Sequence, residues 1–180
     1  MRTFLLALVI LTAPVAAASV DFTAPAVAAP FKLSDARGQF VALHFLLKTE
    51  CPYCLKHTQA YTTRAAEVPG VVQVFLKPDE PAEILMWLAK IKPAGEGDRP
   101  LIYQDAGGKI ADQLKIPGGY QFHGQTMHYP ALVIIDRDGS EAFRYVGKNN
   151  TDRYPFDSFK ERIAELSADA KKEAKKEPTP

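Results

Sequence analysis

Residues 40–54 read FVALHFLLKTECPYC, an apolar run followed closely by two cysteines with two residues between them. The apolar run Phe40–Leu47 is typical of a buried strand. Pro52 follows Cys51 and suits the first position of a helix, because proline fixes φ and has no N–H to leave unpaired. A strand, a Cys-x-x-Cys pair and a helix in this order predict a redox dithiol at a helix N-terminus.

Composition limits the remaining possibilities. The chain has 180 residues, which indicates one domain, and 47% of them are hydrophobic while 24% are charged. These values exclude a mostly disordered chain. Lys+Arg is 22 and Asp+Glu is 21, a net charge of +1, so the chain carries no excess charge for a nucleic-acid partner. Its two cysteines, Cys51 and Cys54, lie too close together in the sequence for a disulfide between them to hold the fold together. Their role is therefore expected to be in a reaction rather than in stability.

The first residues have the pattern of an export signal. Arg2 precedes the apolar run Phe4–Leu11, and Ala16-x-Ala18 forms a small-residue cleavage site. The alternative is an uncleaved membrane anchor, but this run falls short of the ~20 residues that span a bilayer. We therefore expect export into a bacterial periplasm. The expected divisions are a signal peptide (1–18), an N-terminal arm (19–30), one domain (31–168) and a polar, disordered tail (169–180).

Further along the chain, apolar periodicity predicts alternating strands and helices. The helix that begins at Pro52 is expected to end near Glu67, before Pro69 and Gly70. The pattern predicts an α/β fold. Its further elements are strands at Val71–Leu76, Leu101–Tyr103 and Ala131–Ile135, a returning hairpin strand at Glu141–Val146, a helix starting at Pro81, a short helix at Lys109–Leu114 and a last helix starting at Pro155.

The chain also resembles a known family. The segments FKLSDARG (31–38), CPYC (51–54) and PALVIIDRDG (130–139) resemble those of the exported redoxins of the thioredoxin superfamily, and the resemblance covers about residues 31–168. It implies a thioredoxin-like fold with a central mixed β-sheet flanked by helices. It also implies a thiol:disulfide oxidoreductase that needs no cofactor beyond a redox-active Cys51–Cys54 disulfide.

Each cysteine has an expected role. A helix N-terminus favours a thiolate, so Cys51 is predicted to be the exposed, attacking sulfur. Cys54 lies on the same helical face and is predicted to resolve the mixed disulfide. One alternative is a structural disulfide, although a bridge over two intervening residues removes little chain entropy. The other is half of a zinc site, for which the chain has no second Cys-x-x-Cys.

Four residues are expected to contact substrate. Pro52 and Tyr53 lie between the cysteines, and Tyr129 and Pro130 begin the Ala131–Ile135 strand. The resemblance implies a cis Tyr129–Pro130 bond that faces the dithiol, with the backbone of Tyr129 pairing to an extended substrate segment. The alternative is a trans proline at the start of an edge strand.

The sequence departs from thioredoxin beside the cysteines. Thioredoxins carry a buried acid six residues before the first cysteine, where this chain has Phe45, and Glu50 replaces the tryptophan before the motif. A carboxylate at Glu50 would raise the pKa of Cys51 by like-charge repulsion. His44 and Lys48 are candidates for the missing proton acceptor, and each can equally be structural or solvated.

Copper binding is the alternative function. His123, Met127 and His128 lie in the expected loop before Pro130, and thiolates with imidazole suit copper. Copper chaperones of the Sco type use a thioredoxin fold, two cysteines and a distal histidine, here matched by Cys51, Cys54 and His128. Their cysteines are spaced Cys-x-x-x-Cys, which this chain lacks.

A peroxidase is less well supported. Peroxiredoxins hold peroxide with a Pro-x-x-x-Thr-x-x-Cys motif, and the two supporting positions are His44 and Lys48 here. We therefore expect protein thiols and disulfides as partners, a membrane-bound redox protein as recycler, no nucleic acid, and a monomer.

Overall fold

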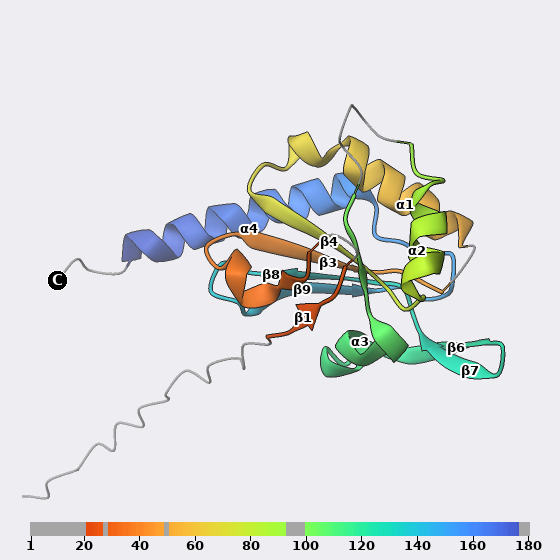
Figure 1. Ribbon diagram of the computed structural model, residues 1–180. Helices are drawn as coiled ribbons and strands as arrows, with labels where there is room; N and C mark the ends of the chain where they lie inside the picture. The colour runs from red at the N-terminus through yellow and green to blue at the C-terminus, as the bar shows by residue number, and fades with distance from the viewer. Residues whose placement is uncertain (1–20, 27–28, 49–50, 93–99, 177–180) are drawn as a thin grey trace, which may run out of the picture.

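The computed structural model describes residues 21–26, 29–48, 51–92 and 100–176. Its centre is a five-stranded sheet in the order β5-β4-β3-β8-β9. Helices α1, α2 and α4 cover one face, and α3 lies with the β6–β7 hairpin beyond the other (Figure 1). The strands are β1 (Thr23–Ala24), β2 (Phe31–Lys32), β3 (Phe40–Phe45), β4 (Val71–Lys77), β5 (Ile102–Gln104), β6 (Gly118–Phe122), β7 (Gln125–His128), β8 (Ala131–Ile135) and β9 (Glu141–Val146), and the α-helices are α1 (Pro52–Thr63), α2 (Pro81–Leu88), α3 (Lys109–Gln113) and α4 (Phe156–Lys176).

The central strand β3 is buried along its whole length. It pairs in parallel with β4 and antiparallel with β8, while β5 is parallel to β4 and β9 antiparallel to β8. A strand covered on both faces needs apolar residues at nearly every position, which explains the unbroken run in β3. The sheet is therefore mixed, and the α/β prediction is confirmed.

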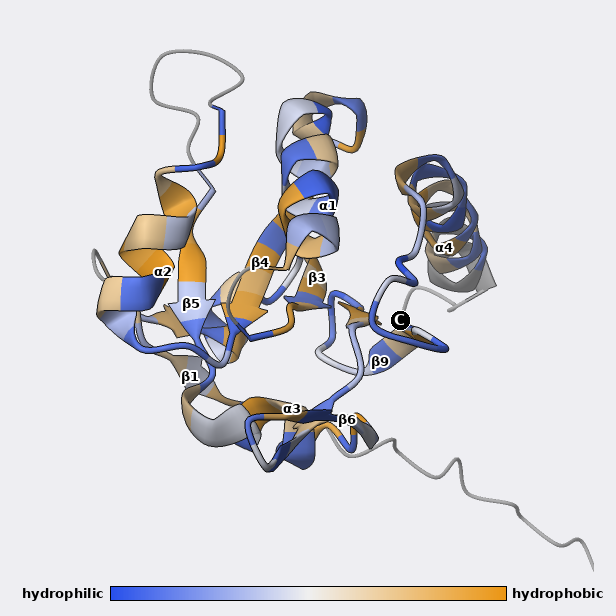
Figure 2. Cartoon of the chain, turned by 90° about the vertical axis from the view of Figure 1, so that its right-hand side faces the viewer, coloured by the Kyte–Doolittle hydropathy of each residue, from blue (hydrophilic) through white to orange (hydrophobic). Residues whose placement is uncertain are grey.

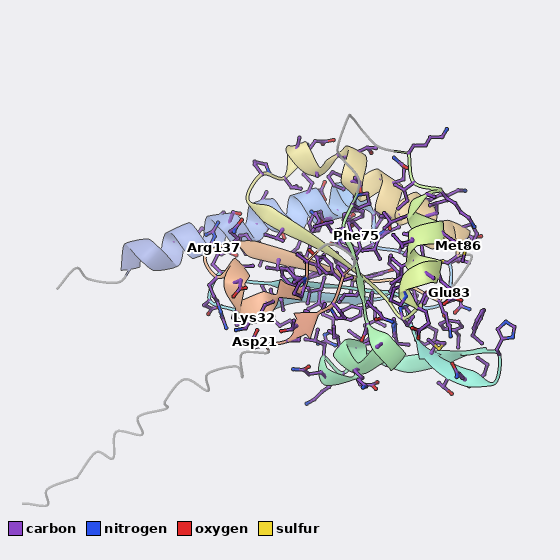
Figure 3. The ribbon with its side chains drawn as sticks, viewed as in Figure 1. Asp21, Lys32, Phe75, Glu83, Met86 and Arg137 are labelled. Atoms are coloured by element: carbon purple, nitrogen blue, oxygen red, sulfur yellow. A yellow bond between two sulfur atoms is a disulfide. The ribbon has the colours of Figure 1, made fainter. Side chains whose placement is uncertain are left out.

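Successive residues of β3 and the position after it pack alternately into two hydrophobic cores, one on each face of the sheet. Phe40, Ala42 and Leu46 pack in the cluster under α1, α2 and α4, where Phe75 also lies. Val41, Leu43 and Phe45 pack in the cluster on the α3 side. Side chains alternate along a strand, so His44 and Phe45 face opposite sides of the sheet. The strands of this sheet are largely apolar in Figure 2, and Figure 3 shows Phe75 in the interior with Glu83 and Met86 at the periphery on α2.

The described part of the predicted arm is packed against the domain. Strand β1 pairs antiparallel with β2, and both Phe22 and Ala24 are buried. The carboxylate of Asp21 accepts a hydrogen bond from the Ser34 N–H at 3.0 Å. The predicted signal peptide, residues 1–18, lies outside the described residues. Within the described ranges, no helix combines the length and apolarity needed to cross a bilayer.

The segment before Pro130 is a β-hairpin, so the prediction of a loop there is wrong. Strands β6 and β7 pair antiparallel and are joined by His123 and Gly124, whose φ values are 47° and 78°. Two consecutive residues with positive φ are typical of the tight type I′ hairpin turn.

The last helix runs further than expected. Helix α4 continues to Lys176, so the prediction of a disordered tail is wrong for residues 169–176. Phe156, Phe159 and Ile163 are buried at helical spacing, and the Lys, Glu and Ala residues that follow have high helix propensity. By contrast, α1 ends slightly early, at Thr63, with a 3₁₀ turn over Ala65–Glu67.

Candidate active site

The two cysteines form a disulfide at the N-terminus of α1. Cys51 is the N-cap residue, and its Sγ accepts a hydrogen bond from the Cys54 N–H at 3.1 Å. The sulfur thus takes the place of the side-chain oxygen that usually caps a helix. Cys51 is 8% exposed and Cys54 is 0% exposed, while Tyr53 between them is 45% exposed. Cys51 is therefore buried in the oxidised form, and the prediction of an exposed sulfur is wrong, but Cys51 is the more accessible of the two cysteines, as an attacking Cys51 and a resolving Cys54 require.

Both sulfur atoms contact one guanidinium group. Arg153 Nη2 lies 3.2 Å from Cys51 Sγ and 3.0 Å from Cys54 Sγ. The Sγ of Cys54 also accepts a hydrogen bond from the Leu47 N–H at 3.3 Å. A positive charge at this distance stabilises a thiolate once the disulfide is reduced, and so lowers the pKa of the thiol.

Arg153 is held by the loop between β9 and α4. Its Nη1 donates to the carbonyl oxygens of Asn150 and Asp152 at 3.1 and 2.7 Å. The Asp152 carboxylate in turn accepts hydrogen bonds from the Tyr145 hydroxyl and the Lys148 N–H. Burial lowers the pKa of Arg153 to about 10, and the group remains charged at neutral pH. No feature of the sequence had singled out Arg153, because it reaches the cysteines only through the tertiary fold.

His44 lies on the same side of the sheet as the dithiol. Its Nδ1 is 2.9 Å from His57 Nε2, and its Nε2 is 2.7 Å from Gln73 Oε1. Burial lowers the pKa of His44 to about 4, although the Gln73 hydrogen bond opposes this shift. Phe45, where counting back from Cys51 had placed the acid of thioredoxins, faces the opposite core. At this end of β3, the buried polar side chain on the dithiol side is therefore that of His44.

Lys48 and Glu50 are the other residues expected to act beside the cysteines. The backbone N–H of Lys48 donates to the Tyr120 hydroxyl at 3.3 Å, and its side chain is partly exposed. Glu50 lies outside the described residues, so its predicted effect on Cys51 remains a prediction.

The Tyr129–Pro130 bond is trans, since residues 21–26, 29–48, 51–92 and 100–176 contain no cis peptide bond. The predicted cis bond is therefore wrong. Trans is the lower-energy isomer of an X–Pro bond, and here it fits the hydrogen bonds on either side. The Tyr129 N–H donates to the Pro117 carbonyl at 3.0 Å, and the Pro130 carbonyl accepts from the Gly147 N–H at 2.8 Å. The Tyr129 N–H is thus already occupied within the chain.

The copper ligands of the alternative function are not brought together. His128 is buried with its ring edge-on to Phe45, and His123 lies in the hairpin turn against Phe122. Among the described residues, no three His, Cys, Asp or Glu side chains are placed to hold one metal ion. Cys51, Cys54 and His128 therefore do not form a common site.

Two hollows lie near the dithiol. A groove of about 330 Å³ is lined by Tyr53, His57 and Arg153 together with Tyr154 and Phe156. A larger hollow of about 510 Å³ lies between the β6–β7 hairpin and the chain around α3. Its lining includes Lys48, Glu80, Asp112, Thr126 and His128.

Comparison with known proteins identifies the family of the chain. The AhpC/TSA family matches residues 15–140, most of the chain. The chain belongs to the AhpC/TSA family. As a redoxin of the thioredoxin superfamily with a Cys51–Cys54 disulfide, it is a thiol:disulfide oxidoreductase, as the sequence predicted. A comparison with curated proteins found no match.

Solved structures share its thioredoxin-like fold. A secreted Mycobacterium tuberculosis disulfide oxidoreductase homologous to Escherichia coli DsbE is 23% identical, with a TM-score of 0.58 over 79% of this chain and 94% of that one. An exposed lipoprotein thioredoxin from Streptococcus pneumoniae is 19% identical, with a TM-score of 0.62 over 81% and 99%. A reduced 2-Cys peroxiredoxin from Plasmodium vivax is 19% identical, with a TM-score of 0.70 over 85% and 96%.

Proposed function

We propose that this redoxin is exported and exchanges disulfides with protein substrates through Cys51 and Cys54. The observation that carries the proposal is the contact of Arg153 with both sulfur atoms of a disulfide at a helix N-terminus. The helix end and the guanidinium both favour negative charge on sulfur. Thiolate stability at both positions is what a dithiol needs to attack a substrate and to act as a leaving group.

In the reductive direction, the reaction has two steps. The Cys51 thiolate attacks a substrate disulfide, forms a Cys51–substrate bond and releases one substrate thiolate. Cys54 then loses its proton and attacks Cys51 Sγ, which closes the Cys51–Cys54 disulfide and releases the second substrate thiolate. The substrate gains two electrons and the dithiol loses two. A membrane-bound redox partner would restore the dithiol, and the reverse sequence would oxidise a substrate dithiol.

The surface around the dithiol supports a polypeptide substrate. Tyr53 is exposed and lines the 330 Å³ groove, and Lys48 lines the 510 Å³ hollow. Pro52 and Tyr53 are the proposed contacts beside Cys51, and Tyr129 and Pro130 those at the start of β8. The N–H of Tyr129 is occupied, and Pro130 is buried, so the half-buried side chain of Tyr129 is the more accessible part of this segment for substrate contact.

Export is supported by the pattern of residues 1–18 and by the secreted and surface-exposed proteins that share the fold. Amino-terminal sequencing of protein recovered from a periplasmic extract should give Ser19 as the first residue. Recovery from the cytoplasm with Met1 intact would contradict this part of the proposal.

Cysteine variants test the exchange activity. Cys51→Ser should abolish reduction of a disulfide-bonded peptide, and Cys54→Ser should accumulate a mixed disulfide through Cys51. Alkylation of the reduced protein, followed by peptide mapping, should label Cys51 before Cys54. Faster labelling of Cys54, or full activity of Cys51→Ser, would overturn the assignment.

The same preparations should be assayed for peroxide consumption. A peroxiredoxin needs Pro and Thr at the positions of His44 and Lys48, and His44 is already bonded to His57 and Gln73. We therefore expect slow peroxide turnover and fast disulfide exchange. The opposite ratio of rates would identify the chain as a peroxidase.

A further inference from the structure

A chain of three hydrogen-bonded side chains runs under the dithiol. His57 Nε2 contacts His44 Nδ1, and His44 Nε2 contacts Gln73 Oε1. With the Gln73 amide as placed, His44 Nε2–H donates to Gln73 Oε1, so His44 Nδ1 accepts from His57 Nε2–H. This arrangement leaves a lone pair on His57 Nδ1. That nitrogen makes no hydrogen bond to any residue in the part of the chain that the structure describes.

His57 lies one helical turn after Cys54. Both belong to the buried face of α1, where residues three apart have Cβ atoms about 5–6 Å from each other. Side chains on a helix generally lean toward its N-terminus, a tendency that favours an approach of the His57 ring to the turn that carries Cys54.

His57 also borders open space. It lines the 330 Å³ groove together with Tyr53, the residue next to Cys54. It further lines a small cavity of about 10 Å³ with Arg153, whose Nε is buried and has no hydrogen-bond partner among the described residues. A cavity of this size is about the volume of one water molecule, and the Arg153 Nε–H is a polar partner for that water. His57 is therefore connected to solvent on the side where the dithiol reacts.

We propose that His57, oriented by His44, accepts the proton that Cys54 loses when it resolves the mixed disulfide. The inference rests on the proposed exchange activity and names the proton acceptor that the phenylalanine at position 45 cannot supply. The Cys54 S–H bond breaks and its proton passes to His57 Nδ1. The Cys54 thiolate then forms the bond to Cys51 Sγ, and the departing substrate thiolate takes up the proton, which His57 returns through the groove.

In the oxidised site, the surroundings of His57 favour its neutral form, which is the form that can accept a proton. Burial lowers the pKa of His57 well below 6.5, and the charges of His44 and Arg153 lower it further. A thiolate beside it would act in the opposite direction, because a nearby negative charge favours the imidazolium. The proton affinity of His57 should therefore be low in the disulfide form and higher in the reduced form.

The titratable groups around His57 come from four parts of the fold. They are His44 from β3, Lys56 and Tyr61 from α1, Tyr145 from β9, and Asp152, Arg153 and Tyr154 from the loop before α4.

The direct test is an NMR titration of the histidine side chains in the wild-type protein, oxidised and then chemically reduced. We expect the pKa of His57 to rise on reduction. The ring resonances of His123, in the β6–β7 hairpin turn, serve as the internal control. An unchanged pKa of His57 in the two redox states would overturn the inference. This measurement needs no substrate and no variant, so it succeeds or fails independently of the proposed function.

The kinetic test follows the second step of exchange. A mixed disulfide formed on Cys51 should decay about tenfold more slowly in His57→Asn, and its rate should depend more steeply on pH, because hydroxide must replace the base. Alkylation of Cys51, the first step, should change much less. His123→Asn is the matched control and should behave as wild type. Equal resolving rates and pH profiles in all three proteins would contradict the role of His57.

His57→Gln provides a check on folding, since it keeps a polar side chain beside His44 but cannot accept a proton near neutral pH. We expect it to resolve as slowly as His57→Asn while retaining the wild-type circular dichroism spectrum. Wild-type resolving rates in His57→Gln would show that the ring only fills space, and would overturn the inference.

Discussion

Arg153 Nη2 lies 3.0 Å from Cys54 Sγ although 99 residues separate the two positions. The same nitrogen is 3.2 Å from Cys51 Sγ, so one charge serves the attacking and the resolving sulfur. In this redoxin a basic residue from the loop between β9 and α4 therefore contributes to the chemistry of the dithiol.

Removing this charge should slow thiolate formation. In Arg153→Met we expect the pKa of the Cys51 thiol to rise by about one unit, since an opposite charge at this range shifts a pKa by about 1–3 units. The rate of iodoacetamide alkylation near neutral pH should then fall roughly tenfold. The measurement is the pH profile of alkylation of the reduced protein.

Arg144→Met provides the control for the charge itself. Arg144 lies on β9 and forms an ion pair with Glu141 instead of contacting the dithiol. Its alkylation profile should match that of wild type. A shift of equal size in both variants would point to a general effect of net charge rather than to the contact with sulfur.

The buried Lys77–Asp79 ion pair should matter for stability and for the cysteine loop. Lys77 is fully buried, and its Nζ also donates to the Leu47 carbonyl at 3.1 Å, while the Leu47 N–H donates to Cys54 Sγ. Because Lys77→Met breaks a buried pair, it should lower the free energy of unfolding by about 3–5 kcal/mol. Urea denaturation measures this change. Lys160→Met, which removes an exposed ion pair with Glu67, should have little effect, and similar losses in both variants would contradict the argument.

Gly119 makes room for the Tyr129 ring. A Cβ added at Gly119 would lie 1.9 Å from Tyr129 Cε2, so Gly119→Ala must displace the ring. We expect a loss of roughly 1–3 kcal/mol in the free energy of unfolding. The double variant Gly119→Ala/Tyr129→Ala should lose less than the sum of the two single variants, because the clash is gone. A Cβ added at Gly118 would lie 3.3 Å from the Thr126 methyl and 3.9 Å from the Met127 carbonyl oxygen, so Gly118→Ala should be milder. Strict additivity in the double variant would contradict the proposed clash.

Stability should fall with acid before the carboxylates titrate. The pKa of His44 is about 4 in the folded chain and near 6.5 when unfolded, and that of His57 is also lowered. Between these values the unfolded chain binds more protons, so stability rises with pH and is lost as the pH falls from 6.5 toward 4. For His44 alone the full difference corresponds to about 3 kcal/mol.

Urea midpoints of the oxidised protein at pH 7.0, 5.5 and 4.5 would reveal this loss of stability. His44→Leu should be less stable at pH 7 but should show a shallower dependence on pH. A wild-type midpoint that stays constant over this range would contradict the assignment of neutral, buried histidines.

The sequence predicted the sheet well because its central strands β3 and β8 are buried along their whole length. The apolar runs in β3 and β8 and the turn at Gly139 leave little choice of secondary structure. The β6–β7 hairpin was missed although His123-Gly124 is a turn signal, because glycines and polar residues in its strands weaken the alternation. The predicted end of helix α4 was too early. A polar segment has no apolar face to bury, but it can still form a helix that is exposed to solvent.

Within the site, the cysteines were predicted and His44 was named as a candidate proton acceptor, but His57 and Arg153 were missed. Counting six residues back from Cys51 selected Phe45, whereas strand alternation puts His44 on the dithiol side. Counting residues back from Cys51 crosses a loop whose length can vary between proteins, so it does not reliably locate a position on the strand. The alternation of side chains along the strand does not depend on that loop. Arg153 carried no local signal at all, since its position follows from the pairing of β8 with β9 and the loop beyond.

The distance in sequence between the sulfurs and Arg153 also sets an order of events during synthesis. At about 5–20 residues per second, the arginine is made roughly 5 to 20 s after the second cysteine. During that interval Cys51 and Cys54 emerge as ordinary thiols, without the guanidinium that later adjusts their reactivity. In the nascent chain the two thiols therefore lack the stabilising charge of Arg153. The guanidinium reaches both sulfur atoms only when the C-terminal third has folded against them.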